Sequence, residues 1–132
     1  SQLVGDGPQV TDERPLHVRV AEALGWKIVY PSPYAPQEWV GASPDARAIV
    51  FGKSGQGEAM VANRVPQVRA LVYPAANLEL VRLGREHNDA NILSIGASFV
   101  GEAEAWEAVQ LFLTTSFSGD ARHVRRIQKI DE

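Results

Sequence analysis

The chain has 132 residues, of which 45% are hydrophobic and 22% are charged, and its formal net charge is −3. This composition is close to the globular average, so it predicts one folded domain over residues 1–132 and argues against a disordered, collagen-like or coiled-coil chain. The mild acidity disfavours partners such as nucleic acid or an anionic membrane. Because the chain has no cysteine, disulfide scaffolds, thiolate zinc sites and cysteine nucleophiles are excluded.

No apolar run is long enough to cross a bilayer, and no basic segment followed by an apolar one stands at the N-terminus. We therefore expect a soluble domain located in the cytoplasm.

The first third of the chain is rich in proline. Leu3–Gly5 is a short apolar run that could form a strand, Leu16–Leu24 has the pattern of a helix, and Lys27–Tyr30 is a second strand candidate. Between Tyr30 and Pro44 the prolines lie too close together for a continuous helix, so this stretch is predicted to be mostly loop or one short helix.

The remainder alternates apolar strands with helices. Predicted strands are Ala48–Phe51, Val68–Tyr73 and Asn91–Gly96, and predicted helices are Glu58–Asn63, Leu78–Arg85, Glu102–Leu113 and Asp120–Ile130. Strands that are apolar throughout are typical of a sheet covered on both faces. The expected fold is thus a three-layer α/β/α domain with a parallel sheet, in which ligands bind beyond the carboxyl ends of the strands.

A glycine-rich loop, Gly52–Gly57, follows the strand that ends at Phe51. Its sequence fits neither a Walker A motif nor a dinucleotide fingerprint. Glycines let backbone N–H groups converge on one point, and the start of a helix adds partial positive charge there, which favours an anionic ligand. A simple tight turn explains the loop equally well. Glu58 directly after it is either a general base or a carboxylate that stabilises the helix start.

His87, Asn88 and Asp89 stand where a helix leads into a strand, which is the sheet edge opposite the glycine loop. They could be an ordinary helix end. If His87 and Glu58 serve one site, however, they come from different subunits, and the protein is a dimer at least.

The C-terminal helix carries Arg122 and Arg126, four residues apart and hence on one face. Two guanidinium groups on one face suit a phosphate dianion, although a solvated basic helix end is the plainer explanation. The three histidines show no metal-binding spacing, so no metal is predicted.

Three separated segments resemble the B-type ribose-5-phosphate isomerases and the related galactose-6-phosphate isomerase subunits. They are Gly52–Glu58 with Ala62–Arg64 after it, Arg85–Asn91 and Arg122–Ile127. The likeness runs from about residue 46 to the end, and residues 1–45 diverge. The resemblance implies a Rossmann-like fold and an aldose–ketose isomerase for a small sugar phosphate such as ribose 5-phosphate, which works through an enediolate without metal or nucleotide cofactor.

The resemblance also implies roles for individual residues. Glu58 would be the base that moves a proton between C2 and C1, and His87 would open the sugar ring with Asn88 beside it. Sites of this family lie between two subunits, so a homodimer or a pair of dimers is expected. Residues that would hold the enediolate oxygens or the phosphate are Ser54, Gly55, Gln56, Gly57, Arg122, His123 and Arg126.

Two departures from the family pattern concern substrate binding. Gly7 and Pro8 occupy the positions of the family's Asp-His pair, for which Asp6 could substitute in part, and Ser98 stands where the family has a phosphate-binding arginine. They leave a second hypothesis open: a weakened or silent sugar-phosphate-binding paralogue, or one subunit of a hetero-oligomer.

Overall fold

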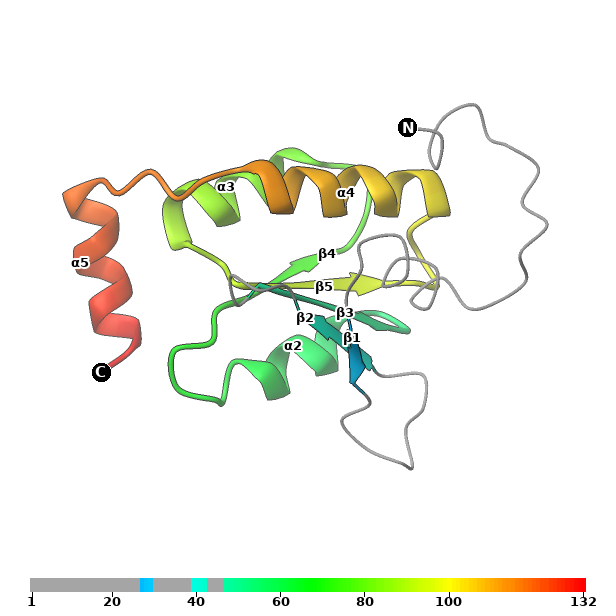
Figure 1. Ribbon diagram of the computed structural model, residues 1–132, viewed down its shortest axis with the longest axis horizontal. Coiled ribbons are helices and arrows are strands. Elements are labelled where there is room, and N and C mark those ends of the chain that lie inside the picture. The colour runs from blue at the N-terminus through cyan, green and yellow to red at the C-terminus, as the bar shows by residue number, and fades with distance from the viewer. Residues whose placement is uncertain (1–26, 30–38, 43–46) are drawn as a thin grey trace.

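The computed structural model describes residues 27–29, 39–42 and 47–132 (Figure 1). Three predictions lie outside these residues: the strand Leu3–Gly5, the helix Leu16–Leu24 and the candidate substrate-binding residue Asp6.

Five strands of the described residues form one sheet in the order β1-β2-β3-β5-β4. They are β1 (Lys27–Val29), β2 (Trp39–Ala42), β3 (Ala48–Gly52), β4 (Ala70–Tyr73) and β5 (Ile92–Gly96). β5 pairs in parallel with β3 on one side and with β4 on the other. This parallel unit is the sheet that the apolar strands predicted, and every residue of β3 is buried.

At the other edge the sheet is antiparallel, which the sequence did not indicate. β2 pairs antiparallel with both β1 and β3, in a register that sets Trp39 opposite Phe51. The prediction of a loop or short helix for this part of the proline-rich stretch is therefore wrong. The prolines exclude a helix, but the interval between Pro36 and Pro44 is free of them, and its residues can pair with the side of β3 that faces away from β5.

The described helices cover both faces of the sheet, as predicted (Figure 1). α2 lies on one face, α3 and α4 lie on the other, and α5 stands at the end of the domain beside α3. Their bounds are α2 (Gln56–Ala62), α3 (Glu79–Asn88), α4 (Glu102–Thr114) and α5 (Ala121–Ile130). Each predicted helix in this part of the chain exists, with ends that differ by a few residues.

The main core lies between the sheet and the helices α3 and α4. Its fully buried members include Ile49, Leu93 and Ile95 from the strands, with Val109 and Phe112 from α4. Burying such side chains is the main favourable contribution to folding.

Arg85 is a charged residue inside this core, with 2% of its surface exposed. Its guanidinium donates hydrogen bonds to the backbone oxygens of Ala90 (2.6 Å) and Thr115 (2.9 Å) and to Asp89 Oδ1 (3.0 Å). A buried charge is tolerated when it is paired in this way. Arg85 thus fixes the end of α3, where His87 lies, to the segment that follows α4.

The outer edge of the sheet is partly covered by a side chain. Ala70 lies on the edge strand β4, and Asn63, just after α2, accepts a hydrogen bond from its N–H (2.7 Å) and donates one to its carbonyl oxygen (3.4 Å). The amide of Asn63 therefore takes the place of a paired strand at this position.

Close approach of two backbones predicts the effect of a glycine substitution. A Cβ on Gly96 would stand closer than 3 Å to the carbonyl carbon and oxygen of Ser54. Because backbone must move to relieve this clash, we expect Gly96→Ala to lower the free energy of unfolding by about 1–3 kcal/mol.

Urea unfolding followed by circular dichroism measures this loss. Gly101→Ala is the control, since a Cβ there meets nothing within 4 Å, and it is expected to cost less than about 1 kcal/mol. Equal stability of the two variants would contradict the packing described here.

Candidate functional site

The glycine loop is closed onto the end of β5. Parallel pairing sets Gly52 beside Gly96, and the chain beyond β5 then bonds to the loop. Ala97 donates its N–H to the Gly52 carbonyl (2.8 Å), and Ser98 donates its N–H to the Lys53 carbonyl (3.1 Å). These bonds use loop carbonyls as acceptors, so they hold the loop without occupying its own N–H groups.

The turn from this loop into α2 depends on Gly55. Its φ of 79° lies in the left-handed region that glycine adopts without a steric penalty. Across this glycine, Ser54 Oγ accepts a hydrogen bond from the N–H of Gln56 (3.2 Å). The first N–H groups of α2 stand at a strand end and have no partners within the helix. Because Ser54 Oγ accepts the first of them, an anion at this place would meet the Ser54 hydroxyl and the amides that follow.

Glu58 lies in the first turn of α2, and its half-buried side chain turns back over the glycine loop. A Cβ on Gly52 would collide with both carboxylate oxygens of Glu58. The carboxylate thus rests against the backbone at the point where β3 ends. A carboxylate and several amide groups therefore share one end of the sheet.

A second group of predicted residues surrounds the end of α3. The imidazoles of His87 on α3 and His123 on α5 are stacked, with ring centroids 4.3 Å apart and planes inclined by 28°. His123 is 4% exposed, whereas His87 is half-buried. The sequence assigned these histidines separate roles, and the structure brings them into contact.

Ser118 is a contact of this stack that the sequence reasoning missed. Its N–H donates to the Glu86 carbonyl on α3 (3.1 Å), and its Oγ lies 3.0 Å from His123 Nδ1. The same oxygen accepts the N–H of Asp120 (3.2 Å), the residue before α5. A serine two residues before the aspartate at the N-cap position of a helix is a turn signal that the sequence does contain.

Three further candidates lie near the stack and are exposed: Asn88 at the end of α3, and Arg122 and Arg126 on α5. Arg122 is 4.0 Å from the Asp120 carboxylate, a weak exposed pair. Both guanidinium groups therefore remain accessible to an anionic ligand. The sequence predicted this basic face of the last helix.

The two groups lie at opposite ends of the parallel strands (Figure 1). The glycine loop and Glu58 follow the carboxyl end of β3, whereas His87 precedes the amino end of β5. One chain therefore does not bring Glu58 and His87 together, which agrees with the topological expectation.

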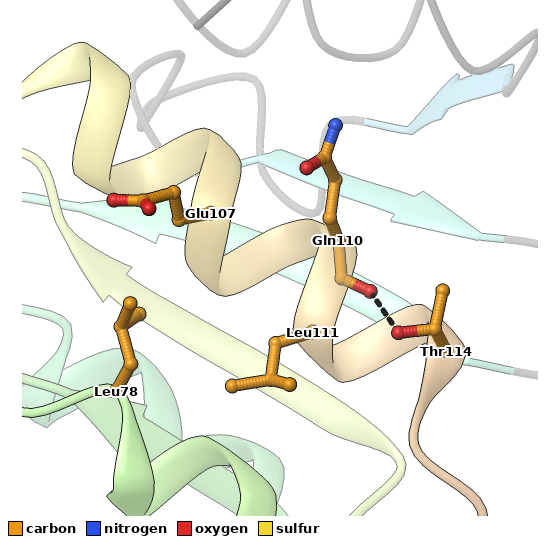
Figure 2. A pocket seen from close by; sticks show the side chains of 5 residues that line it. All are labelled: Leu78, Glu107, Gln110, Leu111 and Thr114. Atoms are coloured by element: carbon orange, nitrogen blue, oxygen red, sulfur yellow. Dashed lines mark hydrogen bonds between the residues drawn. The ribbon is translucent and has the colours of Figure 1, made fainter. Parts of the chain in front are cut away.

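Two hollows in the described surface lie apart from the glycine loop. One, of about 620 Å³, lies between α3 and α4. Figure 2 shows the residues that line it: Leu78, Glu107, Gln110, Leu111 and Thr114. Another, of about 440 Å³, follows the outer edge of β4 and includes Asn88. Neither contains the candidate base, so neither by itself defines a reaction centre.

Residues 27–29, 39–42 and 47–132 hold no cluster of three or more histidine, aspartate or glutamate side chains that could bind a metal ion. The helices in these ranges are also too short or too polar to cross a membrane.

The fold defines a Rossmann-like α/β protein with a glycine-rich loop at the carboxyl end of β3. Residues 35–130 match the model of the Ribose/Galactose Isomerase family, and the chain belongs to that family. Ribose-5-phosphate isomerase B of Mycolicibacterium paratuberculosis is 43% identical over 91 residues, which cover 69% of this chain and 56% of that protein. The chain thus spans about half the length of the curated relatives it matches.

Solved structures agree with this assignment. Ribose-5-phosphate isomerase B of Clostridium thermocellum superposes with a TM-score of 0.70 at 31% identity, over 88% of this chain and 86% of that one. Type B ribose 5-phosphate isomerase of Trypanosoma cruzi gives a TM-score of 0.60 at 41% identity, over 63% of this chain and 54% of that one.

The buried imidazole predicts a pH dependence of stability. Burial, and after it the nearby His87 and Arg122, lower the pKa of His123 below its usual value of 6.5, and Asp120 opposes this shift. The folded chain therefore binds a proton at His123 less readily than the unfolded chain. We therefore expect the contribution of His123 to the free energy of unfolding to be fully present above pH 6.5 and to be lost as the pH drops below it.

Thermal unfolding of the wild type and of His123→Asn at about pH 8 and about pH 5 measures this contribution. We expect the melting temperature of the wild type to fall more steeply with acidification than that of the variant. Parallel curves would show that His123 does not titrate abnormally.

Proposed function

We propose that this protein is an aldose–ketose isomerase for a small sugar phosphate of the ribose 5-phosphate type. The observation that carries the proposal is the Glu58 carboxylate resting on Gly52 at the mouth of the glycine loop. A base beside convergent amide donors suits a reaction in which a proton is removed next to a carbonyl and negative charge develops on oxygen.

In this mechanism Glu58 removes the proton from C2 of the open-chain aldose. The electron pair forms the C1–C2 double bond of the enediolate, and the former carbonyl oxygen takes the negative charge. Ser54 and the N–H groups from Gly55 to Gly57 stabilise that oxygen, and the Gln56 N–H does so by holding Ser54 Oγ in place. The proton of the C2 hydroxyl passes to the oxygen on C1, the protonated Glu58 returns its proton to C1, and the carbonyl forms at C2.

The other half of the site comes from a second copy of the chain. The partner's α3 and α5 supply His87, which opens the sugar ring, with Asn88 beside it. Arg122, His123 and Arg126 bind the phosphate. This assignment rests on two observations: the two groups occupy opposite ends of one protomer's strands, and the His87–His123 stack stands beside the guanidinium groups of α5.

Glu58→Gln tests the assignment of the base. An amide of the same shape cannot accept the proton, so we expect kcat for ribose 5-phosphate to fall by about 10²–10⁴-fold while KM changes little. Glu107→Gln, an exposed carboxylate on the far helix layer, is the matched control and should retain wild-type kcat. Retention of wild-type kcat by Glu58→Gln would refute the assignment.

Mixing two inactive variants tests the shared site. Glu58→Gln and His87→Asn are each expected to be inactive alone. When they are unfolded together and refolded, a mixed dimer contains one site with both residues intact, so about a quarter of wild-type activity should return. No recovery, with mixed dimers detected by mass spectrometry, would place both residues in one protomer's site.

The replacement of the family's arginine by Ser98 favours a second candidate function. Ser98 is exposed next to the glycine loop, and it brings no charge to a phosphate. In this second function the protein binds a sugar phosphate without converting it, or it acts as one subunit together with an intact paralogue. Calorimetric binding of ribose 5-phosphate with no activity, restored on mixing with a paralogue, would favour this alternative.

A further inference from the structure

Ser94 is a fully buried polar residue in the middle of β5, with 0% exposure. Its neighbours Leu93 and Ile95 are equally buried and apolar. A hydroxyl in such surroundings is unfavourable unless it makes a hydrogen bond. Ser94 Oγ makes one, to the carbonyl oxygen of Gly55 at 2.7 Å, and a carbonyl can only be the acceptor.

This bond determines how one peptide of the glycine loop is oriented. In a trans peptide the C=O and the following N–H point in opposite directions. With the Gly55 carbonyl held against β5, the N–H of Gln56 must point away from the sheet, and it is found on Ser54 Oγ, outside the core. The same carbonyl also accepts a longer bond from the Ala59 N–H (3.3 Å).

We propose that Ser94 is a positioning residue that fixes the Gly55–Gln56 peptide, so that the Gln56 N–H holds Ser54 Oγ in place and the loop faces the negatively charged oxygen of the reaction intermediate. This inference rests on the proposed isomerase function for its kinetic consequence, though not for its structural one. Ser94 itself is buried beneath the loop and acts only through the Gly55 carbonyl.

Steady-state kinetics test the consequence. Stabilisation of the intermediate matters more for the chemical step than for substrate binding. Ser94→Ala is therefore expected to lower kcat by about 10-fold to 100-fold while KM stays within about threefold. Ser94→Cys keeps a weak donor of similar size and should retain more of kcat than Ser94→Ala.

Leu93→Val is the matched control, because it truncates a neighbouring buried side chain that, as the next residue along the strand, points to the opposite face of the sheet. It should lower the melting temperature and leave kcat unchanged. The proposal would be overturned if Ser94→Ala kept the wild-type kcat, or if kcat and KM changed by the same factors in Ser94→Ala and Leu93→Val.

Amide hydrogen exchange and ¹⁵N NMR test the structural part without any activity. In Ser94→Ala the Ala59 N–H should exchange about tenfold faster, and the Gln56 and Gly57 amide signals should shift, whereas Leu93→Val leaves them in place. Unchanged amides in Ser94→Ala would refute the proposal. If the wild type turns over no sugar phosphate, the proposed function fails, and this measurement still decides the role of Ser94.

Discussion

The pairing of β3 with β5 is the constraint on which the rest of the site depends. It sets Gly52 beside Gly96, and both positions are closed to any side chain: a Cβ at one would meet the carboxylate of Glu58, and at the other the backbone of Ser54. Where two backbones approach this closely, hydrogen bonds between main-chain atoms and a buried serine hold the loop. The Glu58 carboxylate and the loop amides thus take their positions from the sheet.

The other end of the domain is organised by side chains. Arg85 ties α3 to the segment after α4, and Ser118 links that segment to both α3 and His123. The imidazole stack stands on this support, beside the exposed guanidinium groups of α5. The two ends therefore differ in character: amide dipoles and a carboxylate at one, and imidazole and guanidinium groups at the other.

Much of the fold could be predicted because helix and strand signals are local. Two elements lie where their patterns predicted them: the strand that begins at Ala48 and the helix α3. β2 was not predicted, because prolines indicate only that a helix is excluded. Whether the residues between them form a strand depends on their pairing with β3, which the local sequence does not show. The stacking of His87 on His123 and the bond from Ser94 to Gly55 escaped for the same reason, since each joins residues more than 30 positions apart.

The side-chain amide of Asn63 has a consequence for how copies of this molecule can meet. An unpaired strand at the border of a sheet invites a neighbouring molecule to continue the ladder. Here the hydrogen-bonding groups of Ala70 with which such a continuation would begin are already engaged. Growth by sheet extension is thereby disfavoured at this border, where a second copy could approach only through its helices or loops.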